Sequence, residues 1–177
     1  MTRSTRNLLR VLSISLLGAS TGAAVAETTT ISAVIPWQGQ GQVFQTGENK
    51  AKFLGALEGV MYVETAEGQM NEAFVRCPIV QEINLEDGTS STTASCVIIA
   101  SEEDTAYAEL SCEGGGGVCQ GEFRFTGGEG RLAGIKGKGK MTARSPVHAM
   151  ASDPSGGIVI QAAAGILQMP ELKVTLP

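Results

Sequence analysis

Alternation of apolar and polar residues recurs along most of the chain, and this feature restricts the fold most. In residues 53–65, Leu57, Met61 and Val63 fall on one face of an extended chain. Successive side chains of a strand point to opposite faces, so this pattern predicts a half-buried strand. Similar segments bounded by glycine or acidic turns are residues 39–44, 73–83, 92–100, 105–112, 118–126, 132–143 and 158–169, with a short one at 172–176. The sequence therefore predicts an all-β domain of about eight strands, a spacing typical of barrels and sandwiches.

Glycine interrupts several of these predicted strands. The chain has 23 glycines, and those within alternating segments include Gly55, Gly59, Gly121, Gly134, Gly137 and Gly139. A glycine inside a strand marks a bulge, a sharp bend or a close backbone approach, and Pro78 predicts an edge position or a bulge. A small closed barrel needs such corners, whereas a flat sheet does not. We therefore expect a single barrel, with a β-sandwich as the alternative.

The first 26 residues have the three parts of a secretory signal peptide. The positive start consists of Arg3, Arg6 and Arg10. The apolar run that follows, residues 11–19, is shorter than the roughly 20 residues that a membrane-spanning helix needs. An Ala-x-Ala cleavage site ends at Ala26. We therefore expect cleavage after Ala26, no membrane anchor, one domain over residues 27–177, and a periplasmic or secreted location.

Acidic residues outnumber basic residues in this chain. It has 13 Lys and Arg against 18 Asp and Glu. Removal of the leader, with its three arginines, leaves ten basic residues and a net charge of −8. Nucleic acids and anionic membranes both attract basic surfaces. The charge balance therefore predicts that neither of them is a partner.

Four cysteines follow the leader: Cys77, Cys96, Cys112 and Cys119. An even number in an exported chain predicts two disulfides. A zinc site of four thiolates normally shows closely spaced cysteine pairs, and the gaps here are wide and uneven. We therefore expect disulfides and no metal.

The turn signals between the cysteines favour one pairing. The first two lie symmetrically about Asp87-Gly88, a strong hairpin signal, and the last two flank the flexible glycine run 114–117. The predicted disulfides are Cys77–Cys96 and Cys112–Cys119. The alternative is Cys96–Cys112, because that pair is symmetric about the polar turn 102–104.

A glycine-rich stretch follows the last cysteine, with the spacing Thr126-Gly127-Gly128-x-Gly130-x-x-x-Gly134-x-x-Gly137. It resembles the hairpin-and-strand signature of the allene oxide cyclase-like and dirigent-like barrels, and the strand pair at 106–110 and 121–125 also suits that family. The resemblance covers residues 96–143, about a third of the chain after the leader. It implies an eight-stranded antiparallel barrel with a central cavity, in proteins that often form oligomers. It carries no catalytic residue over, because the reactive groups of the plant enzymes lie elsewhere in the barrel.

Other interpretations of this region are weaker. The stretch has no Walker-type Gly-Lys-Ser/Thr, so phosphate binding is not expected. Its three lysines alternate, which predicts one solvated edge lined by Lys136, Lys138 and Lys140.

No motif identifies a catalytic, metal or cofactor site. His148 is the only histidine, so a multi-histidine metal site is excluded. A Ser-His-Asp triad with Asp153 would lack the Gly-x-Ser-x-Gly elbow. Residues 102–104 lack the spaced ligands of a calcium loop, and we expect them to form a solvated turn.

Four residues on predicted strands are candidate binding residues if they face the interior: Glu58, Tyr62, Glu109 and Glu122. Burial would raise the pKa of an inward carboxyl and make it a candidate general acid or base. Trp37 and Tyr62 are aromatic side chains able to stack on a ligand or to fill the core. The alternative places the glutamates on the polar outer faces of the strands.

Three functions follow from these expectations. The first is an exported, non-catalytic barrel that holds a small apolar molecule inside, because many glycine and alanine residues leave interior room. The second is a structural protein that forms a homo-oligomer. The third is an enzyme of the cyclase or isomerase kind, in which the barrel shapes a reactive substrate.

Overall fold

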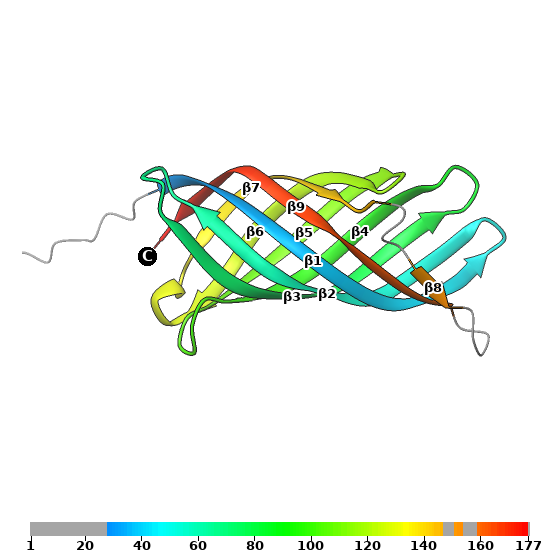
Figure 1. The fold of residues 1–177 in the computed structure, drawn as a ribbon, viewed down its shortest axis with the longest axis horizontal. Helices are drawn as coiled ribbons and strands as arrows, with labels where there is room; N and C mark the ends of the chain where they lie inside the picture. Colours follow the sequence, from blue (N-terminus) through cyan, green and yellow to red (C-terminus); the bar gives the residue numbers. More distant parts are fainter. Residues whose placement is uncertain (1–27, 147–150, 154–158, 177) are drawn as a thin grey trace, which may run out of the picture.

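The computed structural model describes residues 28–146, 151–153 and 159–176, which form one closed antiparallel β-barrel (Figure 1). The strands are β1 (Thr28–Gly47), β2 (Lys50–Glu64), β3 (Met70–Asn84), β4 (Thr89–Ile99), β5 (Thr105–Gly115), β6 (Val118–Glu129), β7 (Lys136–Arg144), β8 (Ala151–Asp153) and β9 (Val159–Thr175). Each strand up to β7 pairs with the next, and pairing of β1 with β9 closes the sheet.

The short strand β8 takes no separate place around the barrel. It pairs with residues 160–162 of β9, beyond residues 166–175, which pair with β7. The barrel is therefore eight-stranded, as the sequence predicts, and the β-sandwich alternative is wrong.

Inward side chains alternate with outward ones in every long strand. In β4, buried Thr92, Ala94, Cys96 and Ile98 alternate with exposed neighbours. The pattern is the one expected for a strand with one face on a core. The first strand is longer than the predicted segment 39–44, because the residues before Gly39 also pair with β9 and β2.

Strand β9 contains one bulge that keeps its apolar residues on the inner face. The two-residue step from Ile31 to Ala33 on β1 pairs with the three-residue step from Leu172 back to Met169 on β9. The extra residue reverses the alternation, so Met169 and Leu172 are both buried. The two segments predicted at 158–169 and 172–176 are therefore one continuous strand.

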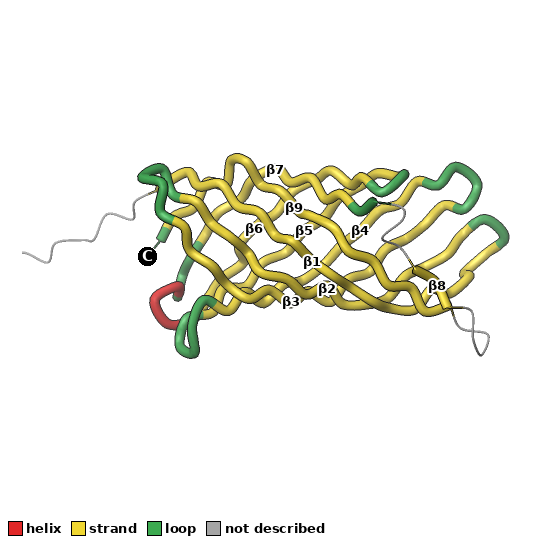
Figure 2. The backbone as a smooth tube through the Cα atoms, in the orientation of Figure 1, coloured by secondary structure: helices red, strands yellow, loops and turns green. Residues whose placement is uncertain are grey.

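Large side chains fill one half of the barrel. The largest fully buried ones are Phe123, Met61, Met169, Leu172 and Val75. The rings of Phe123 and Phe125 meet edge to face, with centroids 5.2 Å apart. This half includes the start of β1 and the end of β9, and it lies on the left in Figure 2. Close packing therefore closes this end of the barrel.

The closed end carries the connection between β6 and β7, with the 3-10 helix η1 (Gly130–Leu132; red in Figure 2). The alternation predicts a strand over 132–143, but β7 starts at Lys136. Gly130 and Gly134 have φ values of +63° and +85°, which an extended strand does not contain. The prediction is therefore wrong for the first four residues of this segment.

Asp104 holds this connection in place. Its Oδ1 accepts a hydrogen bond from the backbone N–H of Arg131 (2.7 Å), and its Oδ2 accepts from Nε and Nη2 of Arg131 (2.8 and 2.6 Å). The side chain of Asp104 is buried, so the predicted solvated turn is wrong for this residue, although Glu102 and Glu103 are exposed.

The Asp104–Arg131 contact makes stability depend on pH. Hydrogen bonds from the side chain and backbone of Arg131 hold the pKa of Asp104 at about 2, below its usual 3.8. A carboxyl with a lowered pKa stabilises the fold fully above the unfolded pKa, and this contribution is lost as pH falls through the folded pKa. In urea titrations, we expect the midpoint difference between wild type and Asp104→Asn to shrink between pH 3.8 and about 2. A difference that stays constant over this range would contradict this role.

All four cysteines are paired, in the predicted arrangement. Cys77–Cys96 links β3 to β4 and Cys112–Cys119 links β5 to β6, so the alternative Cys96–Cys112 is wrong. The β3–β4 register has a gap between Arg76–Val97 and Ile79–Ala94, where Pro78 has no N–H to donate. The Cys77–Cys96 disulfide crosses this gap. Two disulfides indicate a location outside the reducing cytoplasm.

Candidate functional site

The other half of the barrel is hollow. A cavity of about 360 Å³ is lined by residues of β1 to β7 and β9, and it reaches the hairpin turns at Gly88 and Gly116. Its floor consists of buried apolar side chains that also belong to the core: Leu57, Leu110, Met141 and Leu167. The barrel therefore has one packed end and one hollow end that opens between hairpins.

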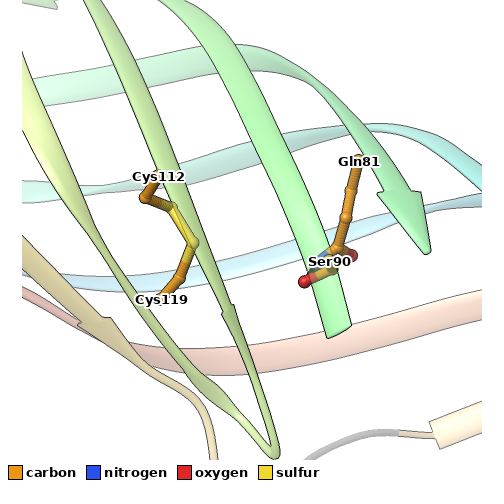
Figure 3. The surroundings of a disulfide bond; sticks show 4 residues. All are labelled: Gln81, Ser90, Cys112 and Cys119. Atoms are coloured by element: carbon orange, nitrogen blue, oxygen red, sulfur yellow. Dashed lines mark hydrogen bonds between the residues drawn. A yellow bond between two sulfur atoms is a disulfide. The ribbon is translucent and has the colours of Figure 1, made fainter. Parts of the chain in front are cut away.

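The wall near the mouth contains a disulfide and a polar pair (Figure 3). The Cys112–Cys119 disulfide lines the cavity beside the β5–β6 turn. Gly116 and Gly117 form that turn with φ values of +60° and +82°, as a two-residue type I′ hairpin requires. Beside it, on the adjacent strands of the wall, Gln81 Nε2 on β3 donates a 3.0 Å hydrogen bond to Ser90 Oγ on β4.

Trp37 lies where the packed half meets the hollow half. It follows the buried Ile35 on the inner face of β1, and it lines the cavity. Its partners on the neighbouring strands are two glycines, Gly59 and Gly165. A Cβ atom on Gly165 would be 2.7 Å from Cζ2 of the indole and would also collide with the carbonyl oxygen of Arg144. The indole ring therefore occupies space that a side chain on β9 would otherwise fill.

One buried donor in this region has no acceptor. Among the residues that the structure describes, Nε1 of Trp37 is the buried side-chain polar atom without a hydrogen-bond partner. Buried donors are nearly always paired, and this one is also out of reach of water in the cavity, because the nitrogen has almost no accessible surface.

The cavity lining is almost free of charge. Arg144, which is exposed, is the one ionisable residue among the described residues that line it. The other polar groups are neutral amides, hydroxyls and the indole: Gln81, Ser90, Thr92, Ser145, Gln161 and Trp37. A lining of this kind suits a neutral, largely apolar molecule, because a charged one would lose its hydration without gaining a partner.

The cavity volume limits the size of such a molecule. An apolar cavity of about 150 Å³ holds benzene, with its six carbon atoms. By proportion, about 360 Å³ admits roughly 14 non-hydrogen atoms. The cavity thus suits a molecule with two or three fused rings or a chain of medium length.

The four candidate binding residues all lie on the outer face. Tyr62 alternates with buried Met61 and is 39% exposed. The glutamates form ion pairs across neighbouring strands: Glu58 with Arg76 (2.7 Å), Glu109 with Arg124 (2.6 Å) and Glu122 with Lys138 (3.9 Å). Glu109 and Glu122 also line one outer depression. None of these four side chains lines the cavity, because each sits out of phase with the inward residues of its strand. Their positions are those of the outer-face alternative.

The alternation pattern of the sequence contains a signal that identifies polar residues of the cavity. Gln81 is in phase with Cys77 and Ile79, and Ser90 is in phase with Thr92 and Ala94. Their place on the apolar face of an alternating segment predicts that they point inward. Lys136, Lys138 and Lys140 are exposed on the opposite face of β7, as predicted, although the closed barrel leaves no edge there.

Several other expectations concern metals, histidine and membranes. Within residues 28–146, 151–153 and 159–176, no cluster of His, Cys, Asp or Glu has the arrangement of a metal site. His148 lies outside the described residues, so the Ser-His-Asp alternative does too. In the same part of the chain, no helix has the length and apolar character needed to cross a bilayer.

The fold and the site together define a class of structure: an antiparallel eight-stranded barrel with a packed end, a hollow end and two internal disulfides. No model of a known protein family matches the chain, and no curated protein matches it significantly.

Proposed function

We propose that this protein is an exported, non-catalytic β-barrel that binds a small, neutral, apolar molecule in its hollow half. The cavity carries this proposal. It is concave, enclosed by eight strands and lined mainly by carbon atoms, with a few neutral polar groups. Sites for small molecules have this composition, and the polar groups in them fix the orientation of the ligand.

The physical driving force is the removal of apolar surface from water. Side chains such as Leu57, Ile79 and Leu167 line the cavity. Each Å² of apolar surface that ligand and wall bury contributes about 25 cal/mol. The two disulfides and the packed end preorganise this wall, so little ordering opposes binding.

The composition of the lining supports binding rather than cyclase or isomerase chemistry. Such chemistry moves protons, and it usually relies on a positioned carboxylate, histidine or tyrosine. Among the described residues that line the cavity, none is of these types. The barrel is also the fold that the resemblance to allene oxide cyclase-like proteins implies, and the disulfides suit a periplasmic or secreted location.

Filling part of the cavity should weaken binding. Ala163 faces the cavity from β9, whereas its neighbour Ala164 is exposed. We expect Ala163→Phe to weaken binding of the neutral three-ring probe 1-aminoanthracene by at least about tenfold, because the phenyl ring occupies nearly half of the ligand volume. The measurement is a fluorescence titration, since the probe brightens on leaving water.

The matched control is Ala164→Phe, which adds the same ring to the outside. Its affinity for the probe should stay close to that of wild type. Saturable binding that is equal in all three proteins would place the probe elsewhere, and no saturable binding to wild type would overturn the proposed function.

A further inference from the structure

Three neutral polar side chains gather on one wall of the cavity, where β3 and β4 pair. Gln81, Ser90 and Thr92 all line the cavity, and Gln81 lies directly opposite Thr92 in the register of the two strands. The hydrogen bond from Gln81 Nε2 to Ser90 Oγ also joins the two strands at this level (Figure 3). These three residues therefore form one polar cluster on an otherwise apolar wall.

The hydroxyl of Thr92 is the member of the polar cluster that the protein leaves without a partner. Thr92 points inward between Ser90 and Ala94 and is only 6% exposed. No hydrogen bond joins its Oγ1 to another described residue, yet this oxygen is not sealed off, because among these residues Trp37 Nε1 is the one unpaired side-chain atom without accessible surface. Since Thr92 faces the interior and lines the cavity, a molecule in the cavity can reach its hydroxyl.

The neighbours of the polar cluster give the site a direction. Toward the packed end, the next inward residues are Ile79 on β3 and Ala94 on β4, which pair with each other, and Ala94 also pairs with Leu110 of the cavity floor. Toward the mouth, Ser90 lies close to the hairpin turn at Gly88. One inward step along a strand is about 7 Å. A molecule with its apolar body on the floor therefore brings a group at its other end to the polar cluster.

We propose that the ligand is an apolar molecule with a neutral hydroxyl group at one end, which hydrogen-bonds to Thr92 Oγ1 while the apolar body lies toward Leu110. This inference rests on the proposed function and adds the chemical class and the orientation of the ligand to it. A ligand that covers the Thr92 hydroxyl removes it from water, so it must offer a replacement partner.

A hydroxyl suits the polar cluster better than other head groups. It both donates and accepts, so it can serve the hydroxyls of Thr92 and Ser90 as well as the carboxamide oxygen of Gln81, which only accepts. A carbonyl could not donate to that oxygen. An ionised head group is disfavoured, because it would lose its hydration beside a cluster that carries no charge.

Two matched probes and one isosteric substitution test this contact. The probes are 2-naphthol and 2-methylnaphthalene, which have the same shape and differ by a hydroxyl against a methyl group. Their dissociation constants are measured by displacement of 1-aminoanthracene. Thr92→Val makes the corresponding change in the protein. We expect it to weaken 2-naphthol roughly tenfold relative to 2-methylnaphthalene, the effect of losing one hydrogen bond at a buried group.

Two further variants serve as controls. Thr92→Ser keeps the hydroxyl, so it should retain most of the preference for 2-naphthol. Thr93→Val makes the same chemical change at the next residue, which is exposed on the outer face of β4. The affinities of this variant for both probes should equal those of wild type.

The orientation is tested by NMR with ¹³C-labelled threonine and leucine methyl groups. In the complex with 2-naphthol, we expect nuclear Overhauser effects from the Thr92 methyl group to the ring protons beside the hydroxyl. The methyl groups of Leu110 should instead contact the other ring.

The outcomes separate this inference from the proposed function. If both probes displace 1-aminoanthracene but Thr92→Val changes their affinities equally, or if the hydroxyl end of 2-naphthol contacts Leu110, the cavity binds ligands without this hydrogen bond and the inference is wrong. If neither probe nor 1-aminoanthracene binds, the proposed function itself fails.

Discussion

Phe123→Ala should lower the free energy of unfolding by about 3–5 kcal/mol, as expected for an aromatic side chain truncated in a core. Phe123 is fully buried, and its ring packs against that of Phe125. The neighbouring strands cannot collapse into the space left behind, because the barrel hydrogen bonds hold their spacing. Chemical denaturation monitored by far-ultraviolet circular dichroism measures the change.

The control for this prediction is Val97→Ala, which removes apolar atoms from the outer face. Val97 is 36% exposed, so its truncation should change stability by much less, about 0.5 kcal/mol. Phe123 does not line the cavity, and folded Phe123→Ala protein should still bind 1-aminoanthracene. A stability change below about 1 kcal/mol would show that the packed end is not the main source of stability.

Removing the Cys77–Cys96 disulfide is expected to destabilise the protein by about 3 kcal/mol. Its cysteines are 19 residues apart in sequence, and the loss of loop entropy in the unfolded chain grows with that separation. This bond also crosses the gap in the β3–β4 ladder at Pro78. The double variant Cys77→Ala/Cys96→Ala is compared with wild type by urea denaturation under oxidising conditions.

The second disulfide provides the comparison. Cys112 and Cys119 are only 7 residues apart, so removing both should cost about 2.5 kcal/mol. Both of these cysteines line the cavity, whereas only Cys77 of the other pair does, so their loss should affect binding of the probe more than the loss of Cys77–Cys96 does. If the short-loop variant were clearly the less stable of the two, strain or local packing would outweigh loop entropy.

The strands and the disulfides were predictable from local patterns. Alternation marks an inward and an outward face, and Gly88 and the 114–117 run place hairpin turns between the right cysteines. The burial of Asp104 was not predictable, because its partner Arg131 lies 27 residues away. The start of β7 depends on the same long-range contact, which ties residues 130–132 into a helical turn.

The cavity itself could not be located from the sequence. Inward positions of both barrel halves carry apolar residues, and only the packing of side chains from different strands shows which half is filled. Trp37 illustrates the limit: alternation predicts the face on which it lies, but the space beside Gly165 and the lack of an acceptor depend on β9, more than a hundred residues later.

Separation of the packed half from the hollow half has an evolutionary consequence. On β9, Met169 belongs to the packed half and Ala163 to the hollow half, six residues or about 20 Å along the strand. Substitutions this far apart contribute nearly independently to stability. Mutations near the mouth can therefore change which molecule fits without destabilising the packed half. Related barrels could then bind different ligands and keep the same architecture.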